Sequence, residues 1–372
     1  MILLTILVFI VILGLLVFVH ELGHFIMAKR AGMRVDEFGF GFPPRIFGFT
    51  RGETTYSVNL IPLGGFVKIL GEDGSETADP RSFNNKSFWQ RFGVLIAGVS
   101  MNVILAWVLL SVGMAAGLPT IVSETDPLPA GAHLRNVSVG ILEIQAASPA
   151  ALAGLKAGDS ILQINGQAIT SVEQIQALTK QAAGQLAVYT IRRGSEIFEK
   201  TIIPRANPKE GEGSLGVALG SVGFLSYPWY QAPIRGAIAV YNMIAFTLIA
   251  FVGIIWQLLQ GQSVGAALAG PVGIAVLTRD VTVLGFIYIL QFAAVLSVNL
   301  AIINAVPFPA LDGGRILFLI IEKLRRKKMN VRAEQLANTI GFILLILLMV
   351  AVTIKDVGRY SEGFKHLFQR MF

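Results

Sequence analysis

The sequence contains no cysteine among its 372 residues, and only 14% of its residues are charged. The lack of cysteine excludes a small secreted scaffold held together by disulfides. So little charge cannot cover the surface of one soluble globule, in which about a quarter of the residues are charged. Apolar residues dominate instead and make up 54% of the chain, which also excludes intrinsic disorder. These numbers indicate a polytopic membrane protein that carries a soluble module.

The excess of basic over acidic residues, 30 against 23, gives a formal net charge of +7. A nucleic-acid-binding protein would gather these residues on one folded face. Here most of them follow apolar runs, as in the group Lys323, Arg325, Arg326, Lys327 and Lys328. That placement is typical of the cytoplasmic loops of membrane proteins. We therefore expect a lipid bilayer as a partner and no nucleic acid.

Several apolar runs are each near the roughly 20 residues that cross the hydrocarbon of a bilayer. They cover residues 1–19, about 93–118, 236–258, 281–306 and 338–354. The first run lacks the basic start and the small-residue cleavage site of a secretory signal peptide, so it is interpreted as a span.

Two more polar stretches separate these runs. Residues 39–71 alternate apolar and polar residues around a turn at Arg51-Gly52-Glu53, a pattern that predicts a β-hairpin. The hairpin at 45–60 offers a strand edge against which an unwound substrate segment could pair. Residues 121–205 contain turn residues that separate short strands and helices, and they are the expected soluble module.

The pentapeptide His20-Glu21-Leu22-Gly23-His24 follows the first apolar run. It fits H-E-x-x-H, in which two histidines one helical turn apart present imidazole nitrogens to one zinc ion. Glu21 lies beside them, where it can accept a proton from water that the metal activates. Gly23 has no side chain and lets another element approach. Polar residues are costly in an apolar helix, which favours a functional site over the alternative that they only mark the membrane–water boundary.

A zinc ion held by two histidines needs a third protein ligand and one open position. Only two further histidines exist, His133 in the polar module and His366 near the end of the chain, and neither extends the motif. A carboxylate is therefore the expected third ligand. Asp312 is the best candidate because it lies between apolar segments in a stretch broken by prolines. The alternative makes Asp312 the N-cap of a helix at 315–324.

These motifs resemble those of the site-2 protease family of intramembrane zinc metalloproteases, in its bacterial RseP/RasP-like branch. HELGH and the pattern N-x-x-P-x-x-x-L-D-G at 304–313 are the paired signatures of that family. Further matches extend the resemblance over almost the whole chain: Gly39-Phe40-Gly41, Pro62 to Lys68, Phe83 to Lys86, Ala97-Gly98 leading to Met101-Asn102, and Gly270-Pro271. Val99 departs from the proline that the resemblance leads us to expect after Ala-Gly, and we expect this position at a helix start and away from the metal.

The resemblance implies one zinc ion per chain, with His20, His24 and Asp312 as its ligands. It implies that Glu21 is the catalytic residue and that Asn304 positions the substrate or stabilises an oxyanion. The implied activity is that of an intramembrane zinc endopeptidase. Such an enzyme cleaves transmembrane segments of single-span membrane proteins in regulated intramembrane proteolysis, for example anti-sigma factors or remnants of signal peptides.

Residues 121–205 resemble a PDZ domain. The matching segments are Val139-Gly140-Ile141, Ser148-Pro149-Ala150, Ala153-Gly154-Leu155, Gly158-Asp159 and Ile164-Asn165-Gly166. Such a domain has a groove between a strand and a helix, to which a peptide can add as an extra strand. The expected partner is a peptide or the ectodomain of a substrate, and the alternative is a spacer without a ligand.

The predicted fold is a polytopic α-helical membrane protein with about four transmembrane helices, a membrane-associated β-hairpin and one inserted PDZ-like α/β domain. Its predicted parts are the first half of the membrane core at 1–120, the PDZ-like domain at 121–205, an interfacial or re-entrant region at 206–280, and the second half of the core at 281–372. In that second half, one span carries Asn304 and Asp312, and the last span lies at about 338–354.

The metal site constrains the topology. His20, His24 and Asp312 must lie at the same depth to share one metal, so the runs that precede them should cross in the same direction. Basic residues follow both runs, which places the active site near the cytoplasmic side. The span at 93–118 then returns outward, and the PDZ-like domain lies outside the cytoplasm. Between the PDZ-like domain outside and the active site inside, the chain can cross the membrane only an odd number of times, and the span ending near 306 already crosses once. We therefore predict that 236–258 lies in the interface or re-enters. The protein is expected to be a multi-pass protein of the bacterial cytoplasmic (inner) membrane.

Two alternative functions belong to other classes. One is a non-enzymatic membrane receptor or scaffold that binds peptides through its PDZ-like domain, with the polar motif vestigial. The intact residues of the H-E-x-x-H motif argue against it. The other is a transporter, since transporters also contain broken helices and intramembrane charges. The two halves of this chain lack the matching interrupted helices of such proteins.

Overall fold

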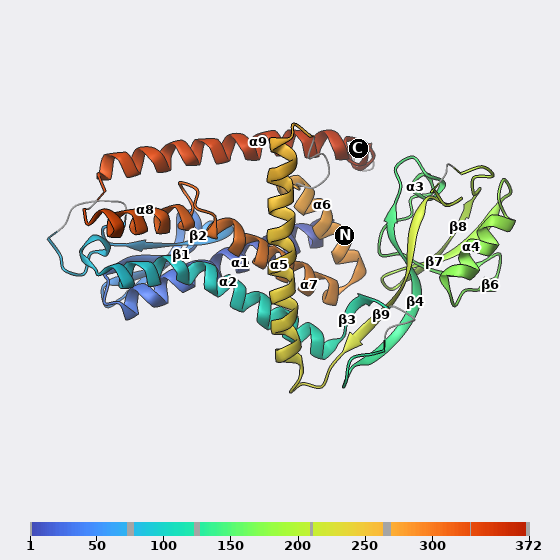
Figure 1. Ribbon diagram of the computed structural model, residues 1–372, viewed down its shortest axis with the longest axis horizontal. Helices are drawn as coiled ribbons and strands as arrows, with labels where there is room; N and C mark the ends of the chain where they lie inside the picture. The colour runs from blue at the N-terminus through green and yellow to red at the C-terminus, as the bar shows by residue number, and fades with distance from the viewer. Residues whose placement is uncertain are drawn as a thin grey trace. The chain divides into compact units, whose positions relative to one another are not determined.

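The computed structural model gives the course of the chain through its helices and strands (Figure 1). It describes residues 2–72, 78–122, 127–208, 211–262, 269–327 and 329–369. The side chains of Leu63 and of residues 360–369, which include His366, are not described. Lys328, the last of the basic group at 323–328, lies outside the described residues.

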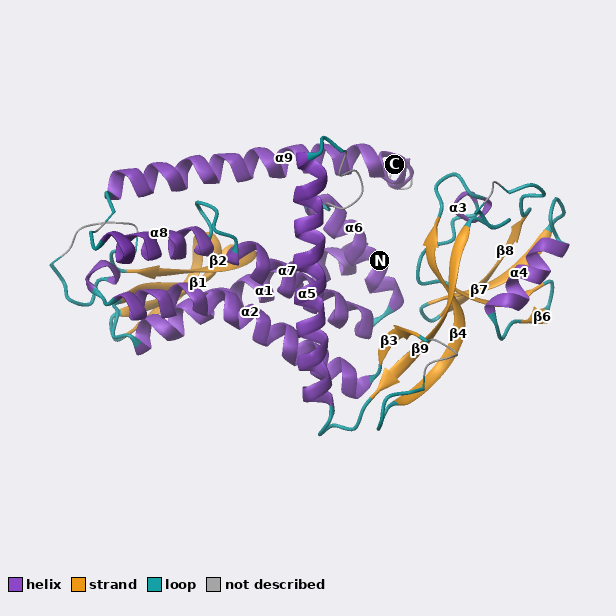
Figure 2. Ribbon diagram, in the orientation of Figure 1, coloured by secondary structure: helices purple, strands orange, loops and turns teal. Residues whose placement is uncertain are grey.

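The chain divides into two compact units. Unit 1 consists of Met1–Leu110, Ala237–Arg279 and Phe292–Phe372, and unit 2 consists of Ser111–Gly236 and Asp280–Gln291. Strands gather in two separate sheets, one in each unit (Figure 2). Both candidate metal motifs of the sequence therefore belong to the same unit, although they come from opposite ends of the chain.

Five helices in the described part of the chain are long and apolar enough to cross a membrane. They are α1 (Ile2–Arg30), α2 (Phe88–Ala116), α5 (Ala232–Leu259), α7 (Phe286–Ala305) and the first part of α9 (Val331–Gln369), from Val331 to Arg359. At a rise of 1.5 Å per residue, the 29 residues of α1 extend about 43 Å, more than the hydrocarbon thickness of a bilayer. The remaining helices of unit 1 are shorter: α6 (Pro271–Leu284) and α8 (Asp312–Arg325).

Helix α5 contains the apolar run at 236–258. It is unbroken over 28 residues, so it adds a fifth candidate to the about four spans of the sequence-based prediction. The placement of 236–258 relative to the bilayer stays a prediction.

The sheet of unit 1 consists of two long antiparallel strands, β1 (Val35–Arg51) and β2 (Thr54–Ile69). Their connection is the tight turn at Gly52, whose φ of 64° favours glycine. Both strands fold back on themselves. Phe38 of β1 pairs with two distant residues of β2, Tyr56 near its start and Val67 near its end. The far end of β2 therefore forms one edge of this sheet, and it lies beside α1 in the structure.

Unit 2 is built on a seven-stranded sheet in the order β3-β9-β4-β5-β7-β8, with β6 paired to β5. Its strands are β3 (Leu118–Ile121), β4 (His133–Ile144), β5 (Ser160–Ile164), β6 (Gln167–Ala168), β7 (Ala187–Arg193), β8 (Glu196–Ile202) and β9 (Val217–Ser226), and its helices are α3 (Pro149–Leu152) and α4 (Val172–Gln181). Alternate strand residues such as Ile161, Tyr189 and Ile191 are buried in one core. This unit contains the predicted PDZ-like range 121–205.

Candidate metal centre

Helix α1 brings two imidazole rings together. His20 and His24 are four residues apart and lie on one face of the helix, with both side chains buried. Their ring centroids are 4.8 Å apart. Their Nε2 atoms are separated by 3.2 Å, so both nitrogens point at the same place.

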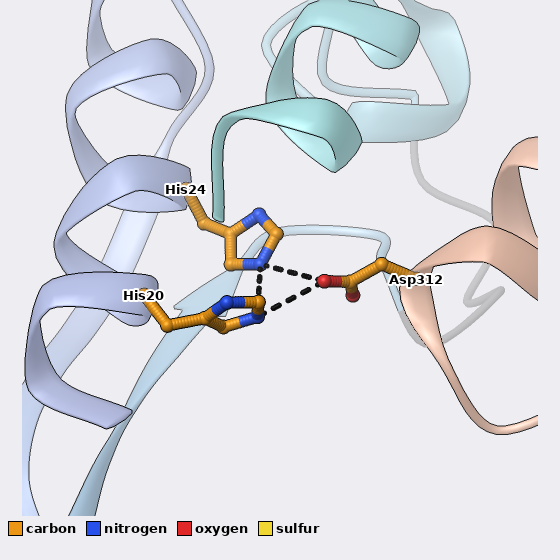
Figure 3. Close-up of side chains that lie close together, drawn as sticks. All are labelled: His20, His24 and Asp312. Carbon is orange, nitrogen blue, oxygen red and sulfur yellow. Dashed lines mark hydrogen bonds and ion pairs between the residues drawn. The ribbon is translucent and has the colours of Figure 1, made fainter. Parts of the chain in front are cut away.

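The carboxylate of Asp312 completes this cluster from the first turn of α8. Its Oδ2 lies 3.0 Å from Nε2 of His20 and 3.4 Å from Nε2 of His24 (Figure 3). Burial raises the pKa of the Asp312 carboxyl, but the two imidazoles outweigh burial and hold that pKa below its usual value. The carboxylate is therefore ionised at neutral pH, as a metal ligand must be.

The loop before α8 holds Asp312 in place by close packing. A Cβ at Gly314 would lie 2.2 Å from the carbonyl oxygen of Phe308, so only glycine allows the loop to fold onto the helix start. Ala310 adopts a positive φ of 75°, and its N–H donates to Oδ1 of Asn338 in α9 at 3.0 Å. Helix α9 thus supports the turn that carries the acidic residue.

These three side chains fit a zinc ion. With bonds of about 2.0–2.1 Å, a tetrahedral zinc site separates its ligand atoms by about 3.3 Å. The distances of 3.0, 3.2 and 3.4 Å between the ligand atoms of His20, His24 and Asp312 match that spacing. In addition, Oδ2 of Asp312 is buried without a hydrogen bond. A cation at this place would satisfy it.

The protonation of His24 also suits metal binding. Its Nδ1 lies 2.8 Å from the carbonyl oxygen of Val94 in α2, and a carbonyl can only accept. The hydrogen of the neutral ring is therefore on Nδ1, which leaves a lone pair on Nε2 for a metal. Such outer contacts orient the ligands in known metal sites.

The alternative role of Asp312 as a helix N-cap is wrong. Helix α8 begins at Asp312 itself, and its N-cap is Leu311, which has no side chain able to cap. The predicted start at residue 315 was therefore three residues late. The side chain of Asp312 points instead at the two imidazoles (Figure 3).

Glu21 follows His20 on α1 and lies beside the end of β2. Its Oε2 accepts a hydrogen bond from the backbone N–H of Val67 at 3.1 Å. A Cβ at Gly65 would lie 3.8 Å from Cγ of Glu21. The β-sheet of unit 1 therefore fixes the position of this carboxylate.

Asn304 is not part of the cluster. It is half-buried near the end of α7, and no hydrogen bond joins it to His20, His24 or Asp312 among the described residues. His133 lies in unit 2, at the start of β4. Among the residues that the structure describes, the group able to hold a metal thus consists of the three predicted ligands.

Helix α2 contributes residues that the sequence did not single out for a role. A Cβ at Gly23 would lie 2.5 Å from the carbonyl oxygen of Ala97, so the predicted close approach to Gly23 is made by α2. A Cβ at Gly98 would lie 2.4 Å from Nε2 of His24. Asn102 lies 3.2 Å from Nδ1 of His20. The only signal in the sequence was the match of this stretch to a family pattern.

Comparisons with known proteins cover most of the chain. The model of Peptidase family M50 matches residues 8–348. A candidate zinc metalloprotease of Clostridium acetobutylicum is 35% identical over 346 residues, 92% of this chain and 94% of that protein. The regulator of sigma-W protease RasP of Bacillus subtilis is 31% identical over 436 aligned positions, covering 95% and 98% of the two chains. For zinc metalloprotease RasP of Geobacillus kaustophilus the identity is 30% over 447 positions, covering 96% and 98%.

Solved structures of PDZ domains are similar to a part of the chain. The PDZ domain of the SdrC-like protein of Listeria innocua is 26% identical, and the match covers 22% of this chain and 92% of that domain. The TM-score is 0.20.

Proposed function

We propose that the chain cleaves transmembrane segments of single-span proteins inside the bilayer. The basis is that it belongs to peptidase family M50 and is a zinc metalloprotease. The observation that carries this proposal is the cluster of His20, His24 and Asp312, in which the two buried histidines belong to an apolar helix of 29 residues. Ionisable groups inside apolar segments are costly and are kept for function. Regulated intramembrane proteolysis, such as the removal of anti-sigma factors or signal-peptide remnants, is the process that we assign.

His20, His24 and Asp312 would hold one zinc ion, which when bound polarises a carbonyl group and makes water more acidic. Glu21 accepts the proton of the attacking water and later delivers it to the leaving amide nitrogen. Because the N–H of Val67 holds Oε2 of Glu21, the carboxylate needs little reorganisation to do so. Asn304 would hold the substrate or a developing oxyanion through its amide.

The edge of β2 at residues 65–69 is the better candidate for pairing with an unwound substrate than the hairpin at 45–60. This segment pairs with β1 on one side only among the described residues, and Val67 within it contacts Glu21. A substrate helix must lose its internal hydrogen bonds before it can be cut, and an added strand recovers some of them. Strand addition here would bring the scissile bond beside the general base.

We also propose that the active site lies near the cytoplasmic side of the bacterial inner membrane. Lys29 and Arg30 end α1. Lys323 and Arg325 lie in the last turn of α8, and Arg326 and Lys327 follow it, so positive charge follows both ligand-bearing segments. The PDZ-like domain then lies outside the cytoplasm. Its proposed partner is a peptide or the ectodomain of the substrate.

The two alternative functions are less consistent with these findings. A non-enzymatic scaffold does not fit a chain that belongs to a peptidase family and has three convergent side chains able to hold a metal ion. A transporter would need a second, symmetric pair of interrupted helices. Neither alternative accounts for a glutamate fixed next to three convergent ligand atoms.

The experiment that tests the proposal uses the purified chain in proteoliposomes with a single-span model substrate. We expect cleavage that requires zinc and that mass spectrometry maps to the apolar segment of the substrate. A chelator should stop the reaction and added zinc should restore it. Cleavage confined to the soluble parts of the substrate would contradict the proposal, as would cleavage that a chelator leaves unchanged.

Replacement of Asp312 by alanine should lower zinc affinity by more than the roughly 10- to 100-fold typical of outer-shell substitutions, because it removes a ligand itself. The measurement is zinc bound per chain after dialysis against a graded chelator. Asp36→Ala is a matched control, since Asp36 forms a surface ion pair with Arg34. Full zinc occupancy in the Asp312 variant would remove Asp312 from the ligand set.

A further inference from the structure

Asn102 is a fully buried amide that faces a metal ligand. Its side chain is 0% exposed, and its Nδ2 lies 3.2 Å from Nδ1 of His20. The hydroxyl of Ser297 on α7, also 0% exposed, donates to the carbonyl oxygen of Asn102 at 2.7 Å. Helices α1, α2 and α7 thus meet at this residue, behind the metal site.

A histidine that binds a metal through Nε2 must carry its hydrogen on Nδ1 when the ring is neutral. For His24 the carbonyl of Val94 accepts that hydrogen. For His20 the atom that faces Nδ1 is Nδ2 of Asn102, which is a donor. Two donors facing one another cannot form a hydrogen bond.

The other end of the same amide resolves this conflict. Oδ1 of Asn102 is buried and has no hydrogen-bond partner. A rotation of the amide by 180° about χ2 exchanges Oδ1 with Nδ2 and leaves the rest of the residue in place. Oδ1 then faces Nδ1–H of His20, so the rotation gives the partnerless acceptor of Asn102 the hydrogen that a zinc-binding His20 carries.

We propose that Asn102 is a positioning residue for the metal centre: its Oδ1 accepts the Nδ1 hydrogen of His20 and thereby directs the lone pair of Nε2 at the metal. This inference rests on the proposed function, because it assumes that His20 is a ligand. The two histidines are then oriented by different means. His24 is held by a backbone carbonyl, which no substitution removes, and His20 by a side chain, which a substitution can test.

The test compares Asn102→Leu with Asn102→Asp in the full chain. Leucine has a similar volume and no acceptor, so zinc affinity should fall by about 10- to 100-fold, the usual effect of losing an outer-shell partner. Aspartate provides acceptor oxygens and should restore the affinity toward that of the unchanged chain, because carboxylates commonly hold metal-binding histidines. Zinc affinity is measured by competition with a chromophoric chelator, and the absorption spectrum of the cobalt-substituted protein gives a second readout of ligand geometry.

Ser297→Ala is the matched control. It removes the hydrogen bond to the backbone carbonyl of Asn102 and leaves the amide, so zinc affinity should stay close to that of the unchanged chain. Unchanged zinc affinity in Asn102→Leu would overturn the proposal. Equal losses in the leucine and aspartate variants would also overturn it, since they indicate packing and not hydrogen-bond acceptance. If Asn102→Leu does not fold, zinc affinity and the cobalt spectrum of Asn102→Asp decide: values like those of the unchanged chain support the proposal.

A separate variant distinguishes this proposal from the metal site itself. His24→Ala removes a proposed ligand and should abolish tight zinc binding. Where His24→Ala loses zinc and Asn102→Leu keeps it, only the role of Asn102 fails. Where the unchanged chain and His24→Ala bind zinc equally weakly, the metal site and the proposed function fail together.

Discussion

Glu21→Gln should abolish cleavage of a single-span substrate and leave zinc binding and expression unchanged. Glutamine has the size of glutamate and can still accept the hydrogen bond from Val67, but it cannot take up the proton of the attacking water. Loss of a general base typically costs about 10²–10⁴-fold in rate. Product formation in proteoliposomes, measured together with zinc content, checks the result.

The control for this substitution is Glu53→Gln at the turn between β1 and β2. Glu53 pairs with Lys29 and Arg81 on the surface, so the same change of charge there should leave the rate within about twofold. Retained cleavage in the Glu21 variant would exclude Glu21 as the base. A loss of zinc in that variant would instead assign Glu21 to metal binding.

The sequence predicts the site better than it predicts what surrounds the site. His20 and His24 follow from their spacing on a helix, because side chains four residues apart lie on the same face. Asp312 follows from the cost of a carboxylate between apolar segments, although the sequence also allowed it as a helix cap. The structure excludes the cap, since Leu311 occupies that position.

The contacts behind the ligands could not be predicted in the same way. They depend on how closely α2 packs against α1, which no periodicity in either helix specifies. The acceptor for His24 is a backbone carbonyl, that of Val94, and any residue type at 94 would provide it. The hydrogen bond between Glu21 and Val67 likewise uses a backbone N–H. Sequence patterns do not indicate such backbone partners, because every residue type has a backbone N–H or carbonyl at that place.

The strand edge next to Glu21 shows the same limit. Alternating residues predicted a hairpin with a turn at Arg51-Gly52-Glu53, and β1 and β2 are joined at that turn. The pattern did not reveal that both strands fold back. Because of that fold, the segment beside Glu21, the proposed base, is the end of β2 at 65–69 and not the hairpin at 45–60.

Gly98→Ala should remove zinc from the protein while leaving helix α2 intact. A Cβ at this position would lie 2.4 Å from Nε2 of His24 and 2.8 Å from Nε2 of His20, in the space where those two atoms converge. Zinc needs to approach each nitrogen to about 2.0–2.1 Å, so the methyl group and the metal compete for one place. Alanine is a better helix former than glycine by about 1 kcal/mol, so the backbone itself gains from the change.

Gly93→Ala is the matched control on the same helix. Its added Cβ would meet only the flexible end of Met27 at 3.4 Å, an ordinary contact, so zinc content should remain that of the unchanged chain. We expect the Gly98 variant to be expressed at a normal level, to bind less than about a tenth of the zinc of the control at equal chelator concentration, and to be inactive. Equal zinc in the two variants would mean that the ligand nitrogens meet the metal elsewhere, and the convergence of His20, His24 and Asp312 on one zinc ion would then be wrong.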